Sequence, residues 1–359
     1  MEDLVNGRGP DPAFWSERRV FLTGHTGFKG AWASLWLWHL GAEVHAFALA
    51  PDTEPNLWGE AGNGILTGET RADLADLEAL RAAITFARPE IVLHLAGQAL
   101  VRRAYVDPLG TVRSNTLGTA NLLEALRGCD TLRAAIIVTT DKVYRNDESG
   151  RAFEEEHPLG GDDPYSASKA AAEMLTRAYA QSYFSGRGVG VATARAGNVI
   201  GGGNWSPDRL VPDIVRAVDR NLPLVLRAPS ATRPWQYVLE PLAGYLVYAE
   251  ALAAKADVPA ALNFGPGDDA RVTVAELAAE MASALGADRS WRMEPDPSFA
   301  EARLLALDST LARQSLGWRS RMSAQEAVSW TASWYAAHRA GADPRTLCLD
   351  QIVSYEALP

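Results

Sequence analysis

The sequence RVFLTGHTGFKG at residues 19–30 decides the fold of this chain. A β-rich apolar run leads into Gly24, Gly27 and Gly30, and an amphipathic pattern begins at Ala31. This order predicts a strand, a tight turn and a helix. Glycines at this spacing let the backbone approach a pyrophosphate closely, and the N–H groups at the helix start attract the anion. Glycine-rich turns also simply connect strands to helices, so dinucleotide binding is a hypothesis that needs its structural context.

Composition excludes several classes of protein. The 359 residues, 47% of them hydrophobic, can form one large domain or two lobes. A net charge of −10 without a Lys/Arg-rich run argues against a nucleic-acid partner. Cys129 and Cys348 lie far apart and predict neither a disulfide framework nor a metal site. An acidic start without a signal-peptide pattern, and the lack of any run of about 18 apolar residues, predict a cytoplasmic protein without a membrane span.

Strand and helix patterns alternate along the first half of the chain. Apolar runs predict strands at 43–49, 90–97 and 134–139, with a weak one at 67–74; helical patterns lie at 31–40, 76–86 and 115–126. Near-continuous apolar strands suit a parallel sheet covered on both faces. We expect a Rossmann-like, doubly wound α/β fold with a dinucleotide-binding domain at 14–200 and, mainly at 201–345, a smaller substrate-binding lobe. No acidic residue ends the second strand, and Asp52 follows late, which leaves NAD and NADP both open.

A group of polar side chains follows the predicted strand at 134–139. Thr140, Asp141 and Lys142 could act there or merely cap the next turn. Tyr165 and Lys169 stand four residues apart at the start of an alanine-rich helix, and this spacing places both on one helix face. A nearby cation favours phenolate, so we expect Tyr165 to act as a base near neutral pH.

This combination resembles the extended short-chain dehydrogenase/reductase family and, within it, the nucleotide-sugar 4,6-dehydratases, most of all those acting on CDP-glucose. The stretches that carry the resemblance are 20–29, 140–142, 163–166, 195–203 (RAGNVIGGG), 232–236 (TRPWQ) and 239–242. It implies a tightly held NAD, reduced and reoxidised within one turnover, and a 4-keto-6-deoxy sugar nucleotide as product. Tyr165, assisted by Lys169 and Thr140, would take the proton of the sugar 4-hydroxyl.

The resemblance also implies which residues bind each ligand. The cofactor is expected to contact Gly24, Thr26, Gly27, Phe28, Lys29, Gly30, Asp73, Leu74, Leu95, Ala96, Gln98, Tyr165 and Lys169. The substrate is expected to contact Asn198, Arg209, Arg227, Arg233 and Arg303, because guanidinium groups match phosphate oxygens. No metal is implied, and a homodimer is expected by analogy.

Dehydration needs an acid for the sugar 6-hydroxyl and a base for C5. Asp141 is the candidate acid, which requires a raised pKa. Lys142 is either the base, the group that stabilises the enolate, or the partner of a carboxylate. Two positions depart from the family pattern. The segment 149–153, followed by Glu154, is expected near the mouth of the site, where it would change substrate contacts, and Tyr237 is the other. Both leave the nucleotide base of the substrate open, more than the reaction.

Two other functions share this fold. A nucleotide-sugar 4-epimerase would use Tyr165 and Lys169 but has no need of Asp141 and Lys142. A non-catalytic NAD-binding protein would have no reason to keep the Tyr165–Lys169 pair. Fold alone does not separate the three.

Overall fold

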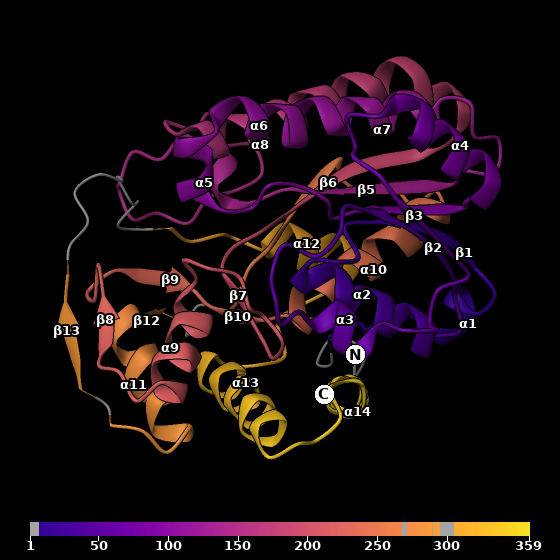
Figure 1. Cartoon of the computed structure of the whole chain (residues 1–359). Coiled ribbons are helices and arrows are strands. Elements are labelled where there is room, and N and C mark those ends of the chain that lie inside the picture. Colours follow the sequence, from indigo (N-terminus) through magenta and orange to yellow (C-terminus); the bar gives the residue numbers. More distant parts are fainter. Residues whose placement is uncertain (1–6, 268–270, 289, 295–304) are drawn as a thin grey trace.

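A seven-stranded parallel sheet forms the centre of the molecule. The computed structural model describes residues 7–267, 271–288, 290–294 and 305–359. The strand order is β11-β6-β5-β4-β1-β2-β3, so the chain winds outward in both directions from β1 and β4 (Figure 1). The predicted doubly wound sheet is confirmed. Its strands are β1 (Arg19–Thr23), β2 (Glu43–Ala48), β3 (Gly68–Arg71), β4 (Ile91–His94), β5 (Ala134–Val138), β6 (Gly190–Ala196) and β11 (Ala261–Phe264).

Helices cover both faces of this sheet. Alternate side chains of β1 point to opposite sides, so Phe21 packs with the helices of one face and Val20 and Leu22 with those of the other. One layer holds α4 (Leu77–Ala87), α5 (Val101–Val106), α6 (Pro108–Val112), the π-helix η2 (Arg113–Leu117), α7 (Gly118–Leu126), α8 (Pro164–Tyr179) and η4 (Ala180–Phe184). The other holds α1 (Pro12–Trp15), α2 (Phe28–His39), α3 (Leu57–Ala61), α10 (Leu239–Ala253), α12 (Thr310–Leu316) and α14 (Pro344–Glu356).

The turn between β1 and α2 depends on close backbone packing. Gly24 has φ +83°, and a Cβ there would lie 2.6 Å from the backbone nitrogen of Ala96. A Cβ on Gly30 would lie 2.0 Å from the carbonyl oxygen of Gly24, so only glycine lets the helix start against the strand end. The helix begins at Phe28, three residues before the predicted start at Ala31, because Gly27 already accepts from the Ala31 N–H. Lys29 and Gly30 therefore lie in the first helical turn.

The second half of the chain adds a smaller lobe beside the carboxyl ends of the strands. In Figure 1 it lies at the lower left. Its elements are β7 (Val199–Ile200), α9 (Leu210–Asp219), β8 (Leu224–Leu226), β9 (Thr232–Pro234), β10 (Gln236–Tyr237), β12 (Arg271–Thr273), α11 (Val274–Ala284), β13 (Trp291–Met293) and α13 (Ala324–Arg339). The chain returns to the central sheet through α10 and β11. In the part of the chain that is described, no helix has the length and apolarity to cross a membrane.

Candidate active site

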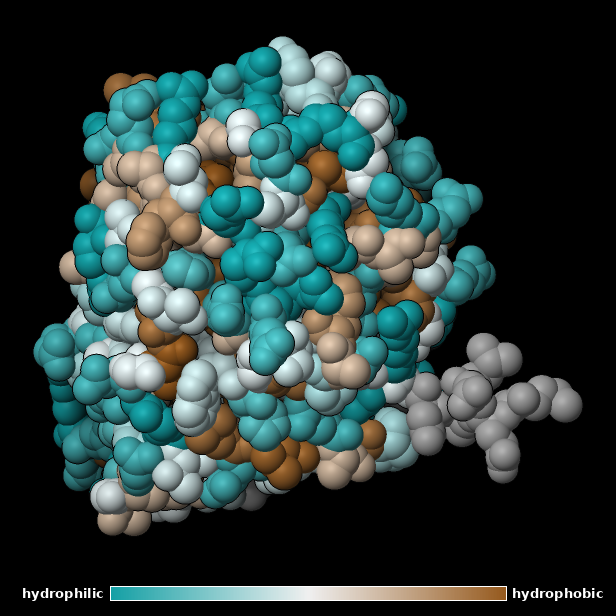
Figure 2. All heavy atoms as spheres, turned by 90° about the vertical axis from the view of Figure 1, so that its right-hand side faces the viewer, coloured by the Kyte–Doolittle hydropathy of each residue, from teal (hydrophilic) through white to brown (hydrophobic). Residues whose placement is uncertain are grey.

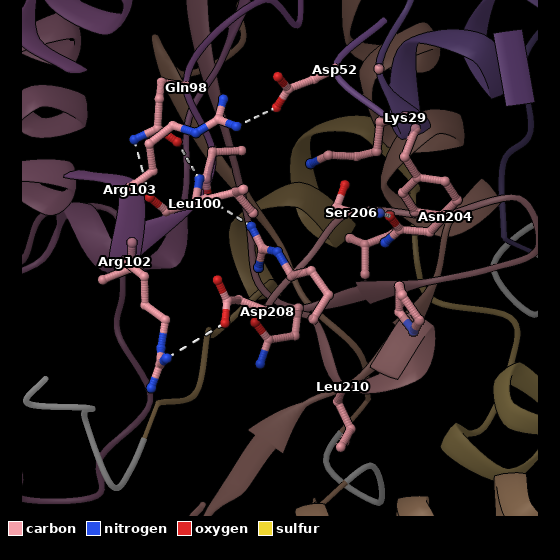
Figure 3. A pocket seen from close by; sticks show the side chains of 18 of the residues that line it. Lys29, Asp52, Gln98, Leu100, Arg102, Arg103, Asn204, Ser206, Asp208 and Leu210 are labelled. Carbon is pink, nitrogen blue, oxygen red and sulfur yellow. Dashed lines mark hydrogen bonds and ion pairs between the residues drawn. The ribbon is translucent and has the colours of Figure 1, made fainter. Parts of the chain in front are cut away.

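One large cavity lies where the sheet meets the smaller lobe. Its volume is about 1100 Å³, and its wall includes residues just beyond the carboxyl ends of β1 to β6 and parts of α9 and β8. Open α/β sheets bind ligands at this edge, where the winding direction of the chain reverses. Figure 3 shows part of this wall, with Lys29 and Asp52 on one side and Asp208 and Leu210 on the other.

The half of the cavity beside β1 and β2 fits a dinucleotide. All eleven residues expected there from the glycine turn and from the ends of β3 and β4 line the cavity. The N-terminus of α2 adjoins it, and the close packing at Gly24 and Gly30 leaves no side chain between this helix end and a pyrophosphate. Burial, followed by the charges of Lys169 and Arg209, lowers the pKa of Lys29 to about 8.

Tyr165 and Thr140 meet on the cavity wall, with Lys169 behind them. Tyr165 lies in the first turn of α8, and Thr140 caps the short helix η3 (Asp141–Val143) that follows β5. Lys169 does not line the cavity; its Nζ donates to the carbonyl oxygen of Val138 at 3.3 Å. Burial lowers the pKa of Lys169 to about 8, which the charge of Glu173 partly opposes.

The pKa of Tyr165 differs from the expectation. Burial raises the pKa of this phenol, and the opposing influences are the charge of Arg209 and a hydrogen bond with Thr140. The charge of Lys169 is not among the main influences on this pKa. The sequence correctly places the phenol and the ammonium on one helix face, but the expected lowering of the phenol pKa by Lys169 is wrong for the protein alone, because burial outweighs the cations.

Asp141 is a buried carboxyl that is only half satisfied. It is 3% exposed, and its Oδ1 accepts a hydrogen bond from Thr140 at 2.9 Å. Its Oδ2 has no hydrogen-bond partner in the described residues. Burial raises the pKa of Asp141, against the influences of Lys142, Thr140 and Arg233. This is the direction that a general acid needs. Lys142, beside it on the wall, is partly exposed.

A second buried carboxylate, Glu173, holds the helix that carries Tyr165. Arg195 contacts it twice, with Nε–Oε1 at 2.9 Å and Nη2–Oε2 at 2.8 Å. The hydroxyls of Thr139 and Thr193 also donate to it. Because Glu173 stands four residues after Lys169, its position on the same face of α8 can be read from the sequence, but its pairing with β6 cannot.

Asn115 was not singled out in the sequence, yet it joins the site together. Its amide donates to Ser168 Oγ at 2.9 Å and to the carbonyl oxygen of Gln98 at 3.0 Å, and its Oδ1 accepts from the Gln98 N–H at 2.8 Å. It lies in the π-helical turn η2, inside the range predicted as regular helix. The amide side chain of Asn115 within an otherwise apolar helical pattern was the feature of the sequence that could have indicated this role.

Cationic residues gather at the other end of the cavity. Asn198, Arg209, Arg227 and Arg233 all line it, as expected for substrate contacts. Arg209 donates to the carbonyl oxygen of Ala99 at 2.6 Å, so it reaches from the smaller lobe to the segment before α5. The remaining expected substrate residue, Arg303, lies outside the described residues.

The two departures from the family pattern lie away from the cavity. None of residues 143–164 lines it. Phe153 is buried and stacks on Tyr144, with ring centroids 4.8 Å apart. Tyr237 is buried against Trp32 and Trp330. Residues 149–153, expected near the mouth of the site, therefore do not line the cavity, and Phe153 and Tyr237 are packing residues.

Comparison with known proteins places the chain in a family. The family described as GDP-mannose 4,6 dehydratase matches residues 21–331. A CDP-glucose 4,6-dehydratase of Salmonella typhimurium is 42% identical over 93% of this chain and 94% of its own. A dTDP-glucose 4,6-dehydratase structure from Streptomyces venezuelae with NAD bound has a TM-score of 0.76 at 25% identity, covering 91% of this chain and 99% of its own. A UDP-glucose 4-epimerase of Thermus thermophilus with NAD has a TM-score of 0.76 at 28% identity, over 88% and 98%. The chain belongs to the GDP-mannose 4,6 dehydratase family.

Proposed function

We propose that this protein is an NAD-dependent nucleotide-sugar 4,6-dehydratase, a hydro-lyase that converts CDP-glucose to its 4-keto-6-deoxy derivative. The observation that carries the dehydration step is the buried, half-satisfied Asp141 beside Tyr165 and Thr140 in the cavity wall. The relative that shares 42% identity along nearly the whole chain supports CDP-glucose as the substrate.

The residues of the wall divide the proton transfers among them. NAD, bound along the glycine turn, supplies the acceptor for the C4 hydride and the source of the hydride returned at C6. Tyr165 acts in its phenolate form, which the charge of Arg209 and the hydrogen bond with Thr140 favour, and takes the proton of the 4-hydroxyl as C4 is oxidised. The resulting ketone acidifies C5–H, and Lys142 takes that proton. Asp141 gives its proton to the 6-hydroxyl, which leaves as water, and Lys142 returns a proton to C5 as the hydride is added at C6.

Lys169 and Asn115 act through other residues. Lys169 adjoins Gly97, where a Cβ would lie 3.1 Å from its Nζ, so it lies behind the wall between α8 and the loop after β4. Asn115 fixes that loop to Ser168 of α8. We assign both to positioning the cofactor end of the cavity.

A 4-epimerase is the second candidate, because epimerases share the fold. It needs the 4-hydroxyl base but not an acid for the 6-hydroxyl. A single incubation with NAD in heavy water separates the two. The dehydratase yields a product that has lost one water and gained one solvent deuterium at C5, whereas an epimerase leaves the mass unchanged. We expect CDP-glucose to react before dTDP-glucose, UDP-glucose and GDP-mannose. Tight NAD binding without turnover of any of them would refute both enzymes.

We further propose a homodimer formed through the helix layer of α5 to α8. Seven exposed apolar residues lie on this layer, six of them between α5 and α8 and Tyr183 on η4: Tyr105, Val106, Leu109, Val112, Leu117, Met174 and Tyr183. Leu109 is 81% exposed and Met174 66%. By contrast, hydrophilic residues predominate in the centre of the face shown in Figure 2. Leu109→Glu with Met174→Glu should give a monomer in light scattering, whereas Phe86→Glu on α4, a matched control for an exposed apolar residue, should not; an unchanged mass of the double variant would contradict this interface.

Two broader assignments belong to the same proposal. We assign the protein to the cytoplasm, which its two buried, unpaired cysteines support. We also divide the chain into a dinucleotide-binding domain at 14–200, to which α10 and β11 return, and a mainly substrate-binding lobe at 201–345. The position of the cavity between the two supports this division.

A further inference from the structure

Asp208 lies between two arginines that belong to opposite sides of the cavity. Its Oδ1 is 2.9 Å from Nη2 of Arg227, which follows β8 in the smaller lobe. The same oxygen is 3.5 Å from Nη1 of Arg102 on α5, in the helix layer of the sheet (Figure 3). One carboxylate therefore faces two guanidinium groups across the substrate end of the cavity.

The backbone directs Asp208 toward this position. Its φ is +58°, in the left-handed region that non-glycine residues seldom adopt and that Asp and Asn tolerate best. The next residue, Arg209, is held by the carbonyl oxygen of Ala99 just before α5. The loop before α9 thus contacts the helix layer twice, through adjacent side chains of opposite charge.

The charges at this end of the cavity favour the binding of an anionic ligand. Arg227, Arg209 and Arg233 line the same wall, and cations outnumber acids in the cavity lining although the chain carries a net charge of −10. Guanidinium groups bind carboxylate and phosphate oxygens with the same geometry. The carboxylate of Asp208 contacts Arg227 with the kind of hydrogen bond that a phosphate oxygen would also accept.

We infer that Asp208 is an internal competitor for the diphosphate of the substrate. Its carboxylate neutralises Arg102 and Arg227 while the site is empty, and the incoming diphosphate displaces it from at least Arg227. This inference rests on the proposed function, because it takes the substrate to be a nucleoside diphosphate sugar. The competition weakens nucleotide binding and speeds the release of product. A carboxylate that merely braced the arginines would do the opposite, since its loss would weaken nucleotide binding.

Asp208→Asn tests the inference with little structural change. Asn has nearly the same size and tolerates the left-handed conformation, but it lacks the charge. Calorimetry on the NAD-loaded protein would measure the binding of CDP and of inorganic pyrophosphate. The variant should bind both about two- to fivefold more tightly than the wild type, as expected for removal of one partly exposed ion pair. Asp219→Asn is the matched control, because Asp219 pairs with Arg339 at 2.9 Å outside the cavity. Its affinities should equal those of the wild type.

The outcomes separate the inference from the proposed function. Equal or weaker binding of CDP and pyrophosphate by Asp208→Asn, with a wild-type melting temperature, would overturn the inference. Should Asp208→Asn fold poorly, Asp208→Gly, which suits the same φ, takes its place with the same expectation. If the wild type binds none of CDP, dTDP, UDP and GDP while pyrophosphate still binds more tightly to the variant, the proposed function fails and the competition stands.

Discussion

Two buried carboxylates near the carboxyl end of β5 are treated in opposite ways by their surroundings. Glu173 receives two contacts from Arg195 and two from threonine hydroxyls. Asp141 receives one hydrogen bond on Oδ1, and its Oδ2 has none within the described ranges. A fully paired buried charge fixes the elements that hold it, whereas an incompletely paired carboxyl favours its protonated form. We therefore assign Glu173 a structural role and Asp141 a catalytic one.

The largest effect should come from Glu173→Gln. The side chain of Arg195 is 4% exposed, so the variant leaves a guanidinium buried without its charged partner. Breaking such a pair costs about 3–5 kcal/mol of unfolding free energy, which urea denaturation would measure. Glu78→Gln is the control, since Glu78 forms an exposed pair with Arg81 on α4, and its loss should leave the urea midpoint unchanged. Equal urea midpoints for Glu173→Gln and Glu78→Gln would contradict the structural role of Glu173.

Asp141→Asn should lower activity and leave stability nearly unchanged, the opposite of Glu173→Gln. We expect kcat to fall about 10²- to 10⁴-fold, the range for loss of a general acid, while the urea midpoint changes little because no ion pair is broken. The raised pKa of Asp141 keeps the proton on the carboxyl to higher pH than usual, so wild-type kcat should fall on the alkaline side as that proton is lost. The residual activity of the variant should lack this decline. Full activity with reduced stability would make Asp141 a structural residue.

The third test uses a buried carboxyl outside the cavity. Burial raises the pKa of Glu240 from 4.5 to about 7, although the N–H groups of Arg321 and Met322 and the hydroxyl of Tyr355 donate to it. A raised folded-state pKa means that the folded protein binds the proton more tightly than the unfolded chain. The contribution of Glu240 to stability is therefore full below pH 4.5 and is lost as pH rises toward 7.

Glu240→Gln isolates this smaller effect. The melting temperature of the variant should decline less between pH 5 and 7 than that of the wild type, and its kcat should stay near the wild-type value. A decline of the same size in both proteins would show that Glu240 does not titrate in this window. Glu240 would then stay charged throughout this range.

Local patterns predicted the central sheet and most of its helices. The glycine spacing around Gly24 and the apolar runs of β4 and β5 lie in consecutive residues, and helix α4 lies within one residue of the predicted range 76–86. The Tyr165–Lys169 pair is of the same kind, because its geometry follows from a single helix. The short helices α5 and α6 escaped prediction, since six and five residues give too little periodicity and tertiary packing decides them.

The parts of the site that sequence did not reveal depend on contacts between distant elements. Glu173 and Arg195 stand 22 residues apart on a helix and a strand. Asp208 and Arg102 meet only because the smaller lobe folds back on α5. The pKa of Tyr165 depends on burial by the completed fold, which a nearby Lys169 in the sequence does not disclose. The spacing of residues along one helix or strand can be predicted from the sequence. Which helices and strands contact one another cannot.

The contacts of Arg321 bear on how the chain could be circularly permuted. Its guanidinium donates to the carbonyl oxygens of Gly7, Tyr355 and Leu358, so Gly7 lies beside the C-terminal residues. A short peptide bridge between them would close the polypeptide into a ring without disturbing the sheet. New ends could then be cut in the exposed loop at 146–149, which touches no part of the cavity. A circular permutant opened there should keep the strand order and the catalytic wall, with Asp141 and Tyr165 now near opposite ends of the polypeptide.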